Sequence, residues 1–146
     1  MGALDHYEYR PVGDIVNAAS RIEGLNKYLG TDILISDAVL QGIDGLLTRK
    51  VGSFVFLGKS APLIIHELLG TRDGATPEQE RLCNDFAEAL DAFSQGAWED
   101  AMAAFSAIDQ TYDGDGPSRF FAPLCEKYRH HRSAEPWSGV VTLDRK

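Results

Sequence analysis

Asn17 and Arg21 lie four residues apart in a stretch whose apolar residues recur at helical spacing. Residues four apart share one face of a helix, so both side chains could reach a single ligand. Arginine brings a permanent charge and a planar fork that suits phosphate, while asparagine brings a neutral donor and acceptor. The pair could therefore hold a phosphate-bearing ligand, although the same spacing also describes an ordinary solvated helix face.

The helix that must carry this pair is predicted over residues 14–28. Asp14 suits the beginning of a helix, and Lys27 suits its end because the helix dipole favours a positive charge there. At about 100° per residue, the apolar side chains fall on a single stripe, with Asn17 and Arg21 on the opposite face. That stripe is expected to pack against a sheet, and it consists of Ile15, Ala18, Ala19, Ile22 and Leu25.

Three apolar segments that follow are predicted to form strands. The run at residues 32–35 suits a short buried strand, and Ser36 is expected to cap a brief helix directly after it. Residues 46–57 and 63–69 then read as a β-hairpin joined by a five-residue turn. A β-bulge is expected at the glycine in position 52.

From about residue 71 the pattern changes to one helix after another, which predicts two domains over residues 1–70 and 71–146. Thr76 and Gln79 have the spacing of a capping box, so a helix should begin there. Gly96 is expected to end this helix, and a second helix is expected after it.

A third helix is predicted to follow a turn at residues 113–117. Pro123 falls inside this helix and is expected to kink or shorten it. Asp113 and Asp115 are interpreted as solvated turn residues rather than metal ligands. The adjacent histidines 130 and 131 are likewise interpreted as an exposed helix end.

The composition is typical of a folded protein and argues against several other classes. The chain has 146 residues, 44% of them hydrophobic, and a net charge of −8, so it can bury a core but is not expected to bind nucleic acid or anionic membranes non-specifically. Two cysteines are too few for a disulfide framework, which favours the cytoplasm. No apolar run approaches the length of a spanning helix, so no membrane segment is predicted.

The helix with Asn17 and Arg21 is followed by three further recognisable segments. They are GTDILIS at residues 30–36, GKSAP at 58–62 and HELLG at 66–70. Together with the residues from Tyr9 onward, they resemble the C-terminal half of the catalytic domain of class III nucleotidyl cyclases, the adenylate/guanylate cyclase family. The resemblance covers about half of the chain. It implies an α+β fold, namely half of a ferredoxin-like cyclase domain with a β-hairpin, and a phosphorus–oxygen lyase of intracellular signalling.

The resemblance also implies roles for the helical pair. In this family the ribose 3′-hydroxyl attacks the α-phosphorus of a nucleoside triphosphate, and pyrophosphate leaves. Arg21 would stabilise the charge that develops on the α-phosphoryl oxygens. Asn17 would orient the ribose for attack.

Two further positions with implied nucleotide-binding roles depart from the family pattern. Lys59 occupies the turn where the family carries a basic loop near the triphosphate, but Leu57 replaces the first lysine of the usual Lys-Gly-Lys arrangement. A lysine that only faces water is an equal alternative for Lys59. Arg10 stands at the base-selecting position, where a guanidinium cannot accept a hydrogen bond from the adenine amino group, so this position does not identify the base.

Family members hold two divalent metals, Mg²⁺ or Mn²⁺, with a pair of aspartates in the first half of the domain. This chain begins near the midpoint of that domain, so no metal ligand is assigned to it, and alone it is expected to be inactive. The enzymes of this family work as dimers. The resemblance therefore implies a dimer partner that carries the metal aspartates.

The helical tail, residues 71–146, has a resemblance of its own. GAWEDA at residues 96–101 followed by Phe105 is similar to half of a tetratricopeptide hairpin, although a generic helical hairpin would look alike. Together with DGPSRF at residues 115–120 and WSGV at 137–140, it resembles the C-terminal extension of bacterial sensor-linked adenylate cyclases, which favours ATP as the nucleotide. Those relatives are membrane-anchored, with the cyclase domain in the cytoplasm.

Two functions follow as hypotheses. The first is a fragment of a class III adenylate cyclase that converts ATP to cyclic AMP and pyrophosphate, with Asn17 and Arg21 as catalytic residues and Lys59 and Arg10 at the nucleotide. The alternative is a non-catalytic regulatory or protein-interaction module whose helical tail docks a partner.

Overall fold

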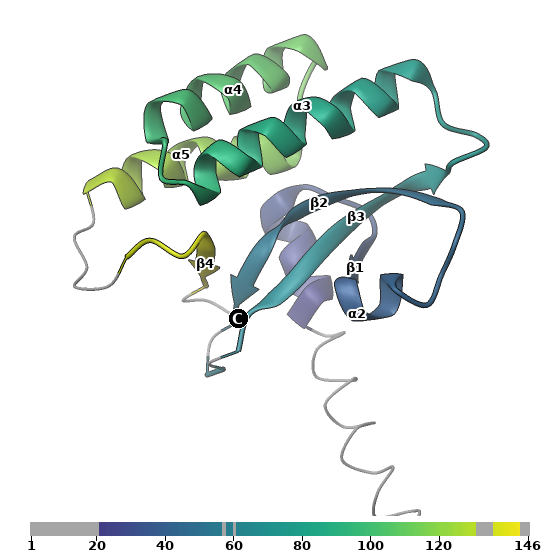
Figure 1. Ribbon diagram of the computed structural model, residues 1–146, viewed down its shortest axis with the longest axis horizontal. Helices are drawn as coiled ribbons and strands as arrows, with labels where there is room; N and C mark the ends of the chain where they lie inside the picture. Colours follow the sequence, from purple (N-terminus) through teal and green to yellow (C-terminus); the bar gives the residue numbers. More distant parts are fainter. Residues whose placement is uncertain (1–20, 57, 60, 131–135, 144–146) are drawn as a thin grey trace, which may run out of the picture.

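The computed structural model describes residues 21–56, 58–59, 61–130 and 136–143. These residues form an α+β fold in which a four-stranded mixed sheet has the strand order β1-β3-β2-β4. Figure 1 shows helices α3, α4 and α5 together on one side of the sheet, above it in this view. The predicted α+β class is therefore confirmed.

The first described element is a helix over residues 21–29. It ends at Gly30, whose φ of 64° lies in the left-handed region that glycine tolerates, and Asn26 accepts hydrogen bonds at this end. The backbone N–H of Thr31 donates to the Asn26 carbonyl at 3.1 Å, and the Thr31 hydroxyl donates to the Asn26 side-chain oxygen at 2.6 Å. These bonds satisfy carbonyl and amide groups at the helix end that would otherwise be buried without partners.

Strand β1 (Leu34–Ser36) leads directly into α2 (Asp37–Leu40). The Ser36 hydroxyl accepts a hydrogen bond from the Val39 backbone N–H at 3.3 Å, as the predicted cap requires. The short strand and the short helix are thus both confirmed, with the strand shifted slightly along the chain.

Strands β2 (Leu46–Val55) and β3 (Leu63–Thr71) form the predicted antiparallel hairpin. The register shifts between Lys50 and Gly52, where φ is 142°, so the predicted irregularity at this glycine is confirmed. A Cβ atom at Gly52 would lie 3.1 Å from a ring carbon of Phe121 and of Phe54. The glycine therefore also lets helix α5 lie close to the strand.

Helix α3 (Pro77–Ser94) begins with the predicted capping box, in which the Thr76 hydroxyl and the Gln79 side chain each accept from the other residue's backbone N–H. Gly96 (φ 77°) separates it from α4 (Trp98–Thr111). Helix α5 (Gly116–His130) continues through Pro123 to His130. This proline therefore does not shorten the helix, and the kink expected as the alternative stays a prediction. The likeness of the three helices to a tetratricopeptide unit stays a prediction.

The core joins the sheet to the helical tail through aromatic side chains. Phe93 of α3 and Phe121 of α5 meet edge to face with their ring centroids 4.9 Å apart, and Phe54 of β2 lies 6.3 Å from Phe121. The sheet and the three helices thus share one apolar cluster. Its fully buried aromatic members are Phe54, Phe86, Phe93, Phe105 and Phe121.

Strand β4 (Val140–Thr142) adds to the other edge of β2 and runs parallel to it. The residues before it are held by Trp137, whose indole N–H donates to the Phe93 carbonyl at 2.7 Å. The Leu143 backbone N–H donates to Val55 at 2.8 Å, directly after the strand. Residues 136–143 therefore bind both the helices and the sheet.

Candidate functional site

The structure describes only one of the three predicted site residues in the N-terminal part of the chain. Asn17 and Arg10 lie outside the described residues, while Arg21 is the first residue of the described helix and is half-buried. Two residues of the predicted apolar stripe, Ile22 and Leu25, are buried in the core, which confirms this part of the stripe. The helix that carries Arg21 is thereby fixed against the rest of the fold by its apolar stripe.

Lys59 lies in the turn between β2 and β3 and is exposed. Its backbone N–H donates to the Phe56 carbonyl at 2.9 Å, and Gly58 before it has φ of 82°, so the backbone of Lys59 is held by a hydrogen bond to the end of the strand region. In Figure 1 this turn and the beginning of the helix over residues 21–29 lie toward the same end of the sheet, at the bottom of the view.

A buried group of charges connects the hairpin to the helical tail. Arg49 of β2 donates from Nε to Glu67 of β3 at 2.7 Å, and from its two terminal nitrogens to both carboxylate oxygens of Asp115 at 3.1 and 2.6 Å. The guanidinium also lies 4.8 Å from the centre of the Phe86 ring. Such a two-pronged contact fixes the orientation of both side chains as well as their charge.

Asp115 is in turn held by Ser118, whose backbone N–H and hydroxyl donate to one of its oxygens at 3.2 and 2.6 Å. The side chain is only 6% exposed, so the expectation of a solvated turn residue is wrong for Asp115. Asp113, two residues earlier, is exposed as expected. No local pattern distinguishes the two aspartates, because the partner of Asp115 lies 66 positions away.

Burial and ionic partners act against each other in this group. Burial lowers the pKa of Arg49. This effect is outweighed by the hydrogen bond to Asp115 and by the charges of Asp115 and Glu67, so the net shift of the Arg49 pKa is upward. Burial raises the pKa of Glu67 above its ordinary value, although Arg49 opposes that shift. Arg49 therefore stays charged, and its two carboxylate partners compensate that charge.

A second polar pair lies on the sheet and was not predicted. His66 of β3 approaches Asp37 with its Nε2 at 2.9 Å, and this hydrogen bond lowers the pKa of Asp37. The other ring nitrogen of His66 is buried and has no hydrogen-bond partner in the described part of the chain. Because a carboxylate can only accept, the hydrogen of this bond lies on Nε2 of His66.

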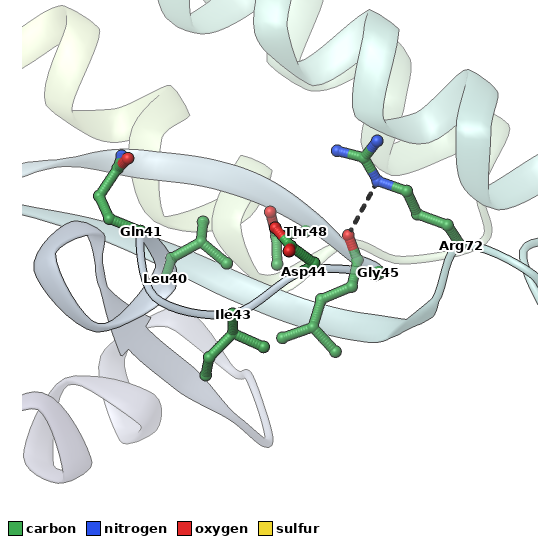
Figure 2. Close-up of a pocket in the computed structure, with 8 residues that line it drawn as sticks. Leu40, Gln41, Ile43, Asp44, Gly45, Thr48 and Arg72 are labelled. Atoms are coloured by element: carbon green, nitrogen blue, oxygen red, sulfur yellow. Dashed lines mark hydrogen bonds between the residues drawn. The ribbon is translucent and has the colours of Figure 1, made fainter.

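A surface pocket of about 360 Å³ lies at the beginning of β2. Figure 2 shows that Leu40, Ile43 and Arg72 are among its walls, and the Arg72 Nε donates to the Leu46 carbonyl at 3.2 Å. Asp44 and Arg72 are its charged lining residues, and neither Arg21 nor Lys59 lines it. The described residues of the candidate nucleotide site are therefore not part of this pocket.

Among the residues that the structure describes, no three or more His, Cys, Asp or Glu side chains come together in a way that could hold a metal ion. The described side chains therefore do not fit the two-metal chemistry that the family resemblance implies. Within the same residues, no helix combines the length and apolar character that a bilayer span needs.

Comparison with known proteins shows which class of protein the chain is related to. No protein-family model and no solved structure matches the chain. Two curated proteins match the chain. "Adenylate cyclase 1" of Rhizobium meliloti is 42% identical over 71 residues, which are 48% of this chain, and "Adenylate cyclase, terminal-differentiation specific" of Dictyostelium discoideum is 27% identical over 130 residues, which are 86% of it.

The chain is therefore related to adenylate cyclases, as the residues at positions 9–70 indicated. The relationship is partial, because the chain spans 11% of the first relative's length and 6% of the second's.

Proposed function

We propose that this chain provides the nucleotide-contacting half of an adenylate cyclase site, which converts ATP to cyclic AMP and pyrophosphate in intracellular signalling. The observation that carries the proposal is the 42% identity over 71 residues to a protein named adenylate cyclase. It is supported by the position of Lys59 in an exposed hairpin turn and by the half-buried Arg21 on a helix whose stripe is packed into the core.

Arg21 acts on the charge of the reacting phosphate. As the ribose 3′-oxygen bonds to the α-phosphorus, negative charge grows on the α-phosphoryl oxygens, and a guanidinium held there stabilises the transition state more than the bound substrate. The helix supplies the rigidity, because Ile22 and Leu25 are anchored in the core. Asn17, one helical turn earlier, orients the ribose hydroxyl in this proposal.

Lys59 binds the polyphosphate in the same proposal. Its ammonium group is a compact charge on a flexible stem, so it can follow the triphosphate and the departing pyrophosphate. Arg10 lies at the base, where it donates to a ring acceptor. The preference for ATP over GTP rests on the names of the relatives and the resemblance of the helical tail.

Mg²⁺ or Mn²⁺, held by residues of another polypeptide, would supply charge neutralisation of the triphosphate and activation of the 3′-hydroxyl in this chemistry. We propose that its aspartate ligands come from a partner protomer, so that each site is assembled from two polypeptides. The purified chain alone should then produce no cyclic AMP.

A complementation assay tests the proposal. The chain is mixed with a full-length relative whose own Asn/Arg pair has been removed, ATP and Mg²⁺ or Mn²⁺ are added, and cyclic AMP is measured. Activity should appear only in the mixture, and Arg21→Ala should lower it about 10²–10³-fold. Lys27→Ala, an exposed cation on the same helix, is the matched control and should leave the activity unchanged.

Failure of the mixture to make cyclic AMP, with the two chains shown to bind each other, would contradict the cyclase proposal. It would favour the alternative of a regulatory or protein-interaction module.

A further inference from the structure

The junction between α4 and α5 (residues 113–118, the α4–α5 junction) contacts two parts of the chain that are distant in sequence. One is strand β2, which leads to the turn with Lys59. The other is the end of the helix that carries Arg21. The helix carries Arg21 and the strand leads to Lys59, so the contacts of the junction bear on the distance between these two residues of the proposed nucleotide site.

On the side of the sheet, the contact is the ion pair of Asp115 with Arg49. Arg49 stands opposite Glu67 in the β2–β3 register, and it binds both Glu67 and Asp115. The junction is therefore tied to both strands of the hairpin through one guanidinium. Because Arg49 is 5% exposed and Asp115 6% exposed, water does not compete for these bonds.

On the side of the helix, the contact is made by the backbone of Gly116. A Cβ atom at Gly116 would lie 2.1 Å from the Leu29 carbonyl oxygen and 3.0 Å from that of Gly30. No side chain fits into this space, so the beginning of α5 lies directly against the end of the helix over residues 21–29. Leu29 itself is fully buried, which prevents the helix end from moving aside.

We propose that Asp115 and Gly116 are positioning residues, which fix the Arg21 helix relative to the Lys59 hairpin. This inference rests on the proposed function. If Arg21 and Lys59 act on one triphosphate, their separation must stay constant. A misplacement of about 1 Å can lower the rate of an enzyme about 10²-fold. The helical tail is then a part of the site's framework, although it need not touch the nucleotide.

A distance measurement tests the positioning without requiring catalysis. Lys27→Cys on the helix and Lys59→Cys in the turn are spin-labelled in a Cys83→Ser chain, and the distribution of distances between the labels is recorded by pulsed electron paramagnetic resonance. Cys125 stays unlabelled because it is fully buried, and burial raises its pKa to about 11. Both labelled positions are exposed.

The unaltered junction should give one narrow distribution. Asp115→Asn and Gly116→Ala should each broaden or shift it, whereas Asp113→Asn, the same chemical change at an exposed position of the same turn, should not. Circular dichroism confirms that each variant is folded. If Asp115→Asn and Gly116→Ala do not fold, Ser118→Ala removes one hydrogen bond to Asp115, leaves the ion pair, and should broaden the distribution to a smaller extent.

The same substitutions in the junction are then made in the chain that retains Lys27, Lys59 and Cys83, and these variants are assayed by complementation. Asp115→Asn should lower kcat about 10-fold or more with little change in KM, because the positioning of bound groups is impaired while the contacts to ATP remain. Distance distributions that match those of Asp113→Asn in all folded variants would overturn the proposed positioning. Absence of cyclic AMP with the unaltered junction would instead contradict the proposed function, and the distance result would still decide the positioning.

Discussion

Replacement of Asp115 by asparagine removes one charge from the buried group formed with Arg49 and Glu67. Breaking a buried ion pair by removing one partner costs about 3–5 kcal/mol, because the remaining charge is left without compensation. Here Glu67 still binds the Arg49 Nε at 2.7 Å, so the loss should fall at the lower end of that range. We expect the free energy of unfolding to fall by about 3 kcal/mol.

Urea denaturation followed by circular dichroism measures this loss. With a slope of about 2 kcal/mol per M, the midpoint should fall by about 1.5 M. Asp113→Asn is the matched control, and an exposed change of this kind should alter stability by no more than about 0.5 kcal/mol. Equal midpoints for the two variants would refute the reasoning, because the Arg49–Asp115 pair would then contribute nothing that a solvated aspartate does not.

Two further predictions concern groups outside this cluster. The hydrogen bond from His66 holds the pKa of Asp37 below its ordinary value of 3.8, so the stabilisation from ionised Asp37 is present above that pH and is lost as the pH falls through the lowered pKa. Asp37→Asn should therefore lower the urea midpoint near neutral pH and cease to do so in strong acid; a difference that persists unchanged in acid would contradict the assignment. In the native protein, a thiol reagent should modify the half-buried Cys83 well before Cys125, whose burial raises its pKa to about 11, and equal rates measured by mass spectrometry would show that Cys125 is accessible.

Features encoded by neighbouring residues could be predicted from the sequence. The capping box of Thr76 and Gln79, the Ser36 cap and the irregularity at Gly52 each depend on residues a few positions apart, so their signals are local. The hairpin was also predicted, because a turn of fixed length joins its two strands. Spacing and family resemblance together predict Arg21, and the resemblance alone predicts Lys59. The catalytic role of Arg21 and the nucleotide-binding role of Lys59 stay predictions.

Features that depend on distant partners could not be predicted. Asp115 has the surroundings of a turn residue in the sequence, and only the fold shows that Arg49 lies beside it. The same holds for His66 and Asp37, which face each other because β1 pairs with β3. Trp137 carries no local sign that its indole would reach the Phe93 carbonyl, since that contact spans 44 positions.

The pairing of β4 with β2 has a consequence for folding during translation. Ser53 pairs with Val140, which is synthesised 87 residues later (140 − 53). The outer edge of β2 therefore stays unpaired until β4 has been synthesised. Until that strand has left the exit tunnel, the edge presents unpaired backbone groups to other nascent polypeptides. Chaperone protection during translation should therefore matter most for this strand, and its final closure is a late event in biogenesis.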